Sequence, residues 1–284
     1  QSIFKEIKET YSKSETGIKH NIKSETLKNF EKDIPFNLTK SQKKVINEIF
    51  KDMNKQSPMK RLLQGDVGSG KTIVAASAIY ASINSSHQAV LMAPTEVLAE
   101  QHYNSLSKVL KYKGIIIFLL TSSTTDRDQI MKIIKDGTPA LIIGTHALIQ
   151  DKINFNNLGL AIIDEQQRFG VEQRKKLISK QKETPHQLVM TATPIPRTTA
   201  LAIYGDLDLS VIDELPPGRK SIKSILREGS KEDTEEVYKI CKNHLDDNSQ
   251  VFVVCPFIEE SEKLDIKAAE NVYKQYKEKF DNYK

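Results

Sequence analysis

The stretch "GDVGSGKT" (residues 65–72) stands between an apolar run, "RLLQ", and a longer run typical of a helix, "IVAASAIYASI". It matches the pattern G-x-x-x-x-G-K-[ST], in which glycines let backbone N–H groups turn toward phosphate oxygens. The N-terminus of the following helix adds a partial positive charge at the same place. A chance match is the alternative reading, but the strand-then-helix context favours a phosphate-binding loop.

Each position in this loop has an expected task. Lys71 reaches the β- and γ-phosphates of a nucleotide, and the Thr72 hydroxyl is a ligand for Mg²⁺. The sequence therefore predicts a site for ATP and magnesium. Its predicted lining residues are Gly65, Asp66, Gly68, Ser69, Gly70, Lys71 and Thr72.

Short apolar runs alternate with helical patterns from about residue 38 onward. The runs are "RLLQG", "AVLMAP", "GIIIFLL", "ALIIG", "LGLAIID" and "QLVMTAT". Runs of four to seven apolar residues with few polar interruptions are typical of a parallel sheet that is covered on both faces. The alternation predicts an α/β fold with right-handed βαβ crossovers and a mostly parallel sheet.

One of these runs ends in acidic residues, in "LAIIDEQQRFG" (residues 160–170). Asp164 closes the predicted strand at the edge where ligands bind in such sheets, so we expect it to hold the magnesium. Glu165 is expected to orient or deprotonate the attacking water. A surface turn with two unpaired acids is the alternative, and the phosphate loop upstream argues for the catalytic interpretation.

Composition narrows the class of protein without fixing it. The 284 residues are 38% hydrophobic and 28% charged, with a net charge of +5, which permits nucleic-acid binding but is equally typical of a solvated surface. No apolar run of membrane-spanning length or signal-peptide pattern is present. Cys241 and Cys255 lack metal-site spacing and are expected to be free thiols in the cytoplasm.

Several motifs in order resemble the superfamily 2 helicases and translocases. They are "GDVGSGKT", "APTEVLAEQH", "GTHALI", "IIDEQQRFG" and "MTATPIPRT", followed by "GDLDLSVIDELPPGRK". Over roughly residues 38–257 the set is similar to RecG, a bacterial family of branched-DNA translocases. The transcription-repair coupling family Mfd is the nearest alternative. Members of the RecG family usually carry a histidine where this chain has Gln167, which cannot titrate near neutral pH.

The resemblance implies an ATP-dependent motor on branched double-stranded DNA, with roles in fork regression, Holliday junction processing, recombination and repair. It implies a bacterial cytoplasmic protein with no membrane partner. We expect residues 1–35 to be a linker with a helical extension, 36–215 a RecA-like ATP-binding lobe, and 216–284 a linker with the partial start of a second lobe. The wedge domain and the arginine fingers of the family are not recognisable, and no arginine follows Arg227. We therefore expect weak binding of Mg-ATP and poor hydrolysis by this chain.

The segment "PFNLTKSQ" (residues 35–42) resembles the part of this superfamily that recognises adenine. Gln42 is expected to read the edge of the base and Phe36 to pack on the ring. Thr39 and Gln42 also fit a capping box that begins a helix, and both interpretations can hold together.

Further residues follow the predicted strands and are expected to contact DNA phosphates without reading bases. For Thr95 the alternative is an ordinary helix N-cap, and for Arg197 a solvated surface arginine. The predicted DNA-contacting residues are Pro94, Thr95, Thr121, Thr145, His146, Arg168 and Arg197.

The resemblance also assigns coupling roles near the acidic pair. Thr191 and Thr193 are expected to hydrogen-bond the two acids and to relate the nucleotide state to the grip on DNA. Gln167 and Arg168 are expected to link the γ-phosphate to the cleft between lobes, with Gln167 counted among the catalytic residues beside Lys71. A nucleotide-dependent binding module without motor activity is the remaining alternative, and Glu165 argues against it. A small-molecule kinase with a phosphate-binding loop is a third alternative, but the motifs "TATP" and "APTEVLAEQH" are not expected in such an enzyme.

Overall fold

The computed structural model describes residues 16–150, 153–165, 183–193, 207–214, 216, 223–255 and 269–283. The chain forms two compact units, Gln1–Arg219 and Lys220–Lys284. Among the described residues, no helix is long and apolar enough to cross a membrane.

The described part of the first unit is built on a seven-stranded sheet in the order β3-β4-β2-β5-β6-β1-β7, and all of its paired neighbours are parallel. The predicted α/β fold with a parallel sheet is confirmed. The strands are β1 (Lys60–Gly65), β2 (Gln88–Met92), β3 (Ile117–Leu120), β4 (Leu141–Gly144), β5 (Leu158–Asp164), β6 (His186–Thr191) and β7 (Asp208–Ile212).

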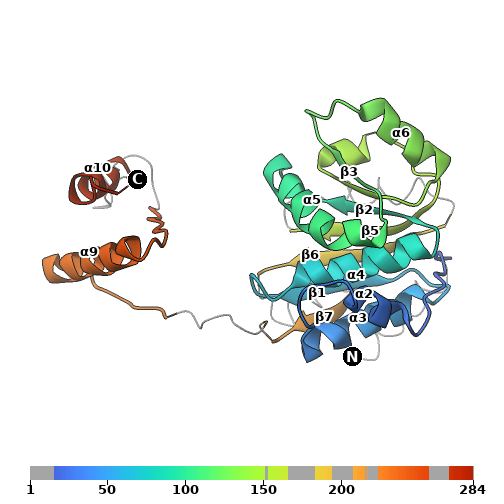
Figure 1. The fold of residues 1–284 in the computed structure, drawn as a ribbon, viewed down its shortest axis with the longest axis horizontal. Helices are drawn as coiled ribbons and strands as arrows, with labels where there is room; N and C mark the ends of the chain where they lie inside the picture. The colour runs from blue at the N-terminus through green and yellow to red at the C-terminus, as the bar shows by residue number, and fades with distance from the viewer. Residues whose placement is uncertain are drawn as a thin grey trace, which may run out of the picture. The chain divides into compact units, whose positions relative to one another are not determined.

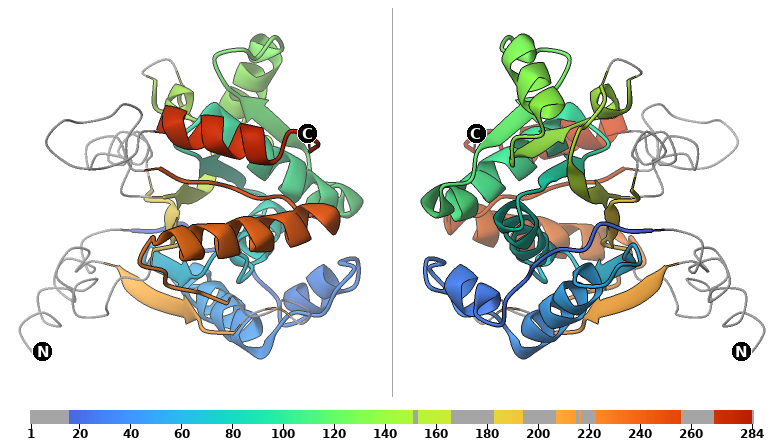
Figure 2. Two further views of the ribbon diagram at one scale, coloured as in Figure 1. Left: turned by 90° about the vertical axis from the view of Figure 1, so that its left-hand side faces the viewer. Right: turned by 90° about the vertical axis from the view of Figure 1, so that its right-hand side faces the viewer.

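Helices connect and cover these strands. Figures 1 and 2 show α6 beside β3 at one end of the sheet and α2 with α3 beside β7 at the other. The helices are α2 (Thr26–Glu31), α3 (Lys40–Met53), α4 (Lys71–Asn84), α5 (Glu96–Leu110) and α6 (Arg127–Asp136), with short 3-10 turns η1 (Lys111–Lys113) and η2 (His146–Ile149).

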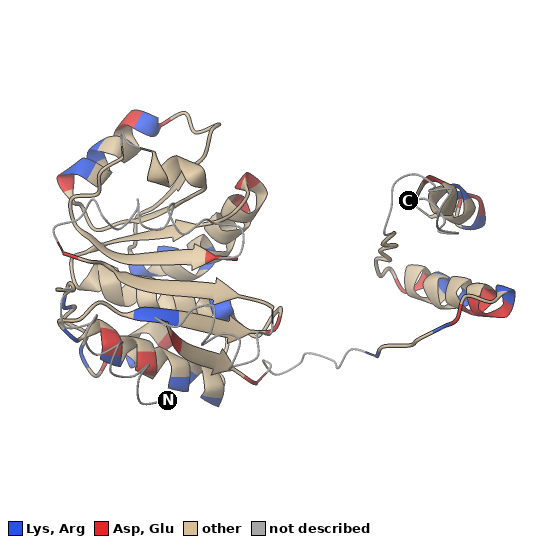
Figure 3. Ribbon diagram, turned by 180° about the vertical axis from the view of Figure 1, so that it is seen from behind, with Lys and Arg blue, Asp and Glu red and all other residues tan. Residues whose placement is uncertain are grey.

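Alternate residues along each strand enter cores on opposite faces of the sheet. Leu91 and Ile162 pack with α3, α4 and α5 on one face, whereas Val90 and Ile163 pack with α6 on the other. Both faces are therefore covered, which explains why the strands are nearly continuous in apolar residues. The distribution of charge agrees with this burial. In Figure 3 the strands carry few charged residues, and the acidic and basic residues lie mainly on the helices.

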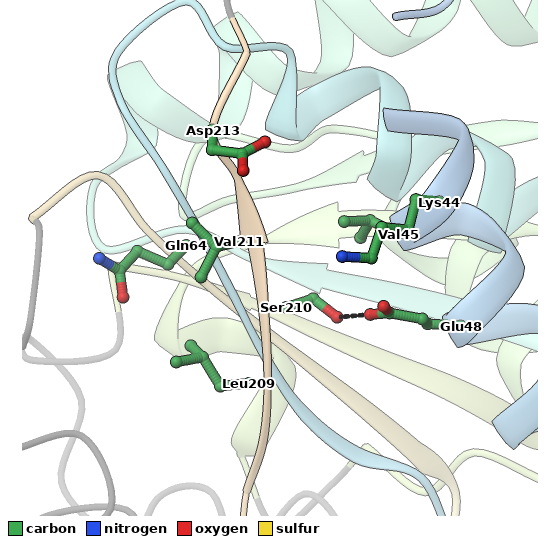
Figure 4. A pocket seen from close by; sticks show the side chains of 8 residues that line it. All are labelled: Lys44, Val45, Glu48, Gln64, Leu209, Ser210, Val211 and Asp213. Atoms are coloured by element: carbon green, nitrogen blue, oxygen red, sulfur yellow. Dashed lines mark hydrogen bonds between the residues drawn. The ribbon is translucent and has the colours of Figure 1, made fainter. Parts of the chain in front are cut away.

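A buried ion network joins α3 to the edge of the sheet. Arg61 on β1 donates to Asp52 and Glu48 of α3 and to Ser210 of β7. Figure 4 shows the pocket beside it, where Ser210 donates a hydrogen bond to Glu48. Burial opposes ionisation of Asp52, but hydrogen bonds from Lys55 and Arg61 outweigh it and hold the pKa of this carboxyl below its usual value. These bonds hold the C-terminal half of α3 against β1 and β7.

Residues 16–35 belong to the packing of the first unit. The Gly17 N–H donates to the Gln56 carbonyl at 2.6 Å, and the His20 N–H donates to the Met53 carbonyl at 2.9 Å. Phe30 is fully buried, with its ring centroid 5.6 Å from that of Tyr80 on α4. The domain boundary expected near residue 35 stays a prediction.

The described helices of the second unit are α9 (Lys231–Asp246) and α10 (Ala269–Lys279). A capping box between Ser230 and Asp233 begins α9, and Tyr238 packs edge-on against Tyr276 and Phe280. The apolar stretch "QVFVVCPF" (residues 250–257) is typical of a strand, but its described residues 251–255 have no strand conformation. Strand-like sequence needs a neighbouring strand to accept its backbone hydrogen bonds, and 251–255 pair with none in the described chain.

Three histidines meet near the amino ends of β2 and β6. The His20 ring centroid lies 4.6 Å from that of His87 and 4.8 Å from that of His186. The Met59 N–H donates to His186 Nδ1, so His186 Nε2 must donate to the Ile18 carbonyl at 2.7 Å. Burial lowers the pKa of His186 to about 4, and burial with the neighbouring His186 lowers the pKa of His20 to about 3. Both rings are therefore neutral in the folded chain.

Acid should unfold the protein partly through these rings. Below pH 6.5 the unfolded chain protonates both histidines while the folded chain does not, so the free energy of unfolding falls as the pH falls toward 4. Each ring contributes about 1.4 kcal/mol per pH unit in this window. Urea titrations monitored by circular dichroism should give a slope shallower by about that amount for His20→Gln. His244→Gln, at an exposed position on α9, is the control, and equal slopes for His20→Gln and wild type would contradict the account.

Candidate functional site

The carboxyl ends of all seven described strands lie at one edge of the sheet, because the strands are parallel. The strand order sorts the predicted residues along that edge. Loops after β3, β4 and β2 carry five of the seven predicted DNA contacts, and loops after β5, β6 and β1 carry predicted phosphate, metal and coupling residues. The other two predicted DNA contacts, Arg168 and Arg197, follow β5 and β6 in the sequence. Neither group could be placed beside the other from sequence spacing alone.

The 65–72 loop has the conformation that a phosphate cradle requires. Gly68 and Gly70 have φ of 76° and 91°, a region that favours glycine. The Ser69 N–H donates to the Asp66 carbonyl at 3.1 Å, which closes the turn. Lys71 Nζ donates to the carbonyls of Gly65 at 2.6 Å and Asp66 at 3.0 Å, so the ammonium lies across the mouth of the loop.

The acidic pair reaches the same place from β5. Burial lowers the pKa of the Lys71 ammonium, and the carboxylates of Asp164, Glu165 and Asp66 act in the opposite direction. Glu165 has a φ of 51°, unusual for a residue other than glycine, and its N–H donates to the Met190 carbonyl at 3.1 Å. The structure thus brings the predicted catalytic lysine and both acids to one edge.

Gln42 connects the loop to the start of α3. The predicted capping box is confirmed: Thr39 Oγ1 accepts from the Gln42 N–H, and the Thr39 N–H donates to Gln42 Oε1 at 2.9 Å. Gln42 Nε2 donates to the Ser69 carbonyl at 2.8 Å. One N–H and one lone pair of the amide are then left, the combination that pairs with N7 and the N6 amino group of adenine.

A pocket of about 530 Å³ adjoins these residues, a size typical of sites for small molecules. Its walls include both predicted adenine contacts and one face of α5. The lining residues are Phe36, Asn37, Gln42, Gly70, Thr72, Ile73, Ser105, Leu106, Val109 and Pro216. The position of Ser105, Leu106 and Val109 in this wall was not expected from the sequence.

The end of β7 is tied to the same helix. Ser41 Oγ donates to Asp213 at 2.8 Å, and the Ser41 N–H donates to Glu214 at 3.0 Å. Two carboxylates at the N-terminus of α3 are favourable because the first N–H groups of a helix carry a partial positive charge. The family motif "GDLDLSVIDELPPGRK" therefore contacts the helix that carries Gln42 through Asp213 and Glu214.

Four of the predicted DNA contacts follow β2 and β4. They are Pro94 and Thr95 after β2, and Thr145 and His146 after β4. Thr95 is exposed and caps α5, accepting from the Leu98 N–H at 3.3 Å. His146 is exposed at the start of η2. Their DNA roles stay predictions, and for Thr95 capping and phosphate contact remain compatible.

Thr121 differs from the other predicted DNA contacts. It is buried, and its hydroxyl lies 3.0 Å from that of Ser123. The exposed neighbour Ser122 donates from both its N–H and its hydroxyl to Glu96 on α5. Sequence reasoning missed this link between the loops after β2 and β3.

The predicted coupling threonines lie at the end of β6. The Thr191 and Thr193 hydroxyls are 2.8 Å apart, and the Ala192 N–H between them donates to Glu165 at 3.4 Å. Gln167, Arg168 and Arg197 lie outside the described residues, so their expected roles stay predictions.

A contact that the sequence did not suggest joins the two halves of the edge. His102 Nε2 on α5 lies 2.6 Å from Asp164 Oδ2, and both side chains are nearly buried. His102 stands in the quoted motif "APTEVLAEQH", but 62 residues separate the partners and no spacing rule connects them.

Comparison with known proteins identifies a family that shares this set of motifs. The DEAD/DEAH box helicase family matches residues 39–201, a stretch that begins at the α3 capping box and includes the loop, the acidic pair and the threonines. The chain belongs to the DEAD/DEAH box helicase family. The ATP-dependent activity that the motifs predict is typical of this helicase family.

Within this helicase family the resemblance to RecG is confirmed. The chain is 50% identical to ATP-dependent DNA helicase RecG of Aquifex aeolicus over 281 residues, covering 98% of this chain and 35% of the relative. It is 45% identical to that of Thermotoga maritima over 271 residues, covering 94% and 34%. The chain thus spans about a third of the length of these curated relatives.

Solved structures agree. The structure of RecG bound to a three-way DNA junction superposes with a TM-score of 0.81 at 38% identity, covering 98% of this chain and 36% of that chain. The helicase MrfA bound to DNA, at 18% identity and a TM-score of 0.56, covers 81% of this chain and 36% of its own, and shares the fold.

Gly70→Ala tests how tightly the helicase loop is built. A Cβ at Gly70 would lie 2.3 Å from Gln42 Nε2, whereas a Cβ at Gly114, whose φ is also positive, meets nothing within 4 Å. Both changes strain the backbone by about 1–3 kcal/mol, and only Gly70→Ala should also displace Gln42 at a further cost of about 1 kcal/mol. Urea midpoints and binding of a fluorescent ATP analogue measure this. Equal destabilisation by both variants, with binding retained, would show that Gln42 does not hold the loop.

Proposed function

We propose that this chain is the ATP-binding lobe of a RecG-type translocase that acts on branched double-stranded DNA in fork regression, Holliday junction processing, recombination and repair. The observation that carries the proposal is the meeting of Lys71, the acidic pair and Gln42 at one edge of the sheet. In this proposal residues 1–35 are an extension, 36–215 the lobe, and 216–284 a linker with the start of a second lobe. The wedge domain and the rest of the second lobe are supplied from outside these residues.

The residues present fit ATP and magnesium. Ser69 Oγ is buried without a hydrogen-bond partner in the described chain, a cost that a ligand would relieve. Space at Gly70 is so restricted that a Cβ would fill it, and Lys71 Nζ needs only to leave two carbonyls to meet a phosphate. Thr72 and Asp164 would hold the magnesium, which neutralises charge on the phosphate oxygens.

In the proposed function, different residues of this chain bind the phosphates, select the base and activate the water. N–H groups of the loop and Lys71 bind the β- and γ-phosphates, Gln42 selects adenine, and Phe36 covers the ring. Glu165 orients or deprotonates the attacking water. Gln167, Arg168, Thr191 and Thr193 relate the nucleotide state to the grip on DNA.

DNA is held by phosphate contacts and not by base reading, so binding is independent of sequence. The proposed contacts lie after β2, β3 and β4 and in the segments beyond β5 and β6. They are Pro94, Thr95, Thr121, Thr145, His146, Arg168 and Arg197.

ATP turnover by this chain, with and without forked DNA, tests the proposal. We expect weak Mg-ATP binding that Lys71→Ala reduces at least tenfold, about 1.4 kcal/mol, and negligible turnover in both conditions because the opposing lobe is needed. Lys51→Ala, an exposed lysine on α3, is the matched control.

Two results would contradict this. Nucleotide binding that is insensitive to Lys71→Ala would remove the ATP site from the 65–72 loop. Strong DNA-stimulated turnover would mean that these residues complete the site themselves.

A further inference from the structure

The contact between His102 and Asp164 bridges the two halves of the functional edge. His102 lies on α5, which follows β2, and Asp164 ends β5, the neighbour of β2 in the sheet. Their side chains are 12% and 13% exposed, and Nε2 lies 2.6 Å from Oδ2. A hydrogen bond to a carboxylate at this depth is worth more than a surface pair, because little water competes for it.

The bond restrains the carboxylate that the proposed function gives to magnesium. A carboxylate has about four lone-pair sites on two oxygens, so Oδ2 can accept from His102 while the remaining sites face a cation. The terminal torsion of an aspartate is otherwise soft, and an unpartnered carboxylate samples a broad range of orientations. Imidazole Nε2–H is a donor of fixed direction because the ring belongs to a helix packed on the sheet.

The same helix reaches two other parts of the site. Ser105, Leu106 and Val109 stand three, four and seven residues after His102, which places them on the same helical face, and they line the pocket beside Gln42. Thr95 caps α5 about 10 Å before His102 along the axis. Helix α5 and its N-cap therefore carry the proposed DNA contact Thr95, the Asp164 partner His102 and part of the wall of the pocket beside Gln42.

We propose that His102 is a positioning residue that holds the Asp164 carboxylate in the orientation magnesium needs, and so fixes α5 to the metal site. The inference rests on the proposed function. Removing a hydrogen-bond partner of a metal-binding carboxylate typically weakens metal affinity 10- to 100-fold, which sets the expected size of the effect.

The experiment measures the magnesium requirement of nucleotide binding. A fluorescent ATP analogue is titrated onto the chain at increasing Mg²⁺, and separately in EDTA, which isolates binding without the metal. His102→Leu removes the donor at similar volume, His102→Asn shortens it out of reach, and His102→Gln keeps a donor on a longer arm. Gln101→Ala, an exposed neighbour on α5, is the matched control.

We expect the half-saturating Mg²⁺ concentration to rise about tenfold in His102→Leu and His102→Asn and to stay within about threefold of wild type in His102→Gln. Binding in EDTA should be unchanged in all variants. If His102→Leu does not fold, the half-saturating Mg²⁺ concentrations of His102→Asn and His102→Gln are compared with each other instead.

Two results overturn the inference. An unchanged magnesium requirement without the donor means that His102 does not position Asp164. Parallel losses in EDTA and in Mg²⁺ mean that His102 supports only the packing of α5. Failure of the proposed function is separate, because it would show in the wild type as nucleotide binding that Lys71→Ala does not affect.

Discussion

The amide of Gln42 is the interaction on which the nucleotide site depends. It closes the capping box that begins α3, and it donates to the Ser69 carbonyl within the phosphate loop. Each bond stabilises the fold by about 1 kcal/mol, but an unpaired buried amide costs about 1–3 kcal/mol, so the loop and the helix hold each other in place. Gly70 has a positive φ beside this amide, where a Cβ would displace it.

The parallel sheet brings that local arrangement to the same edge as the other proposed site residues. Because every described strand points the same way, the loops that follow them meet at one edge, and the strand order sets loops with proposed DNA contacts beside loops with proposed nucleotide contacts. β2 and β5 meet at the boundary, and the bond from His102 to Asp164 crosses it. Ser41 likewise ties α3 to Asp213 and Glu214 after β7. In the proposed function, these contacts would connect nucleotide binding to DNA binding.

Local patterns made much of this predictable. The apolar runs gave the strands β1 to β6, and Thr39 with Gln42 gave the start of α3. β7 was not recognised as a strand because its buried residue Ser210 is polar and is satisfied by Arg61 and Glu48, which hides the usual alternation. Contacts such as His102 with Asp164, or His20 with His186, depend on how distant segments meet in the sheet, and no local spacing encodes them.

The preference of this chain for ATP over GTP tests the central role of Gln42 most directly. Gln42→Ala and Thr39→Ala both break the capping box, but only the former removes the amide that faces the base pocket. The account predicts that wild type and Thr39→Ala prefer ATP, whereas Gln42→Ala loses the preference as well as affinity. A preference that survives in Gln42→Ala, or that both variants lose equally, would contradict it.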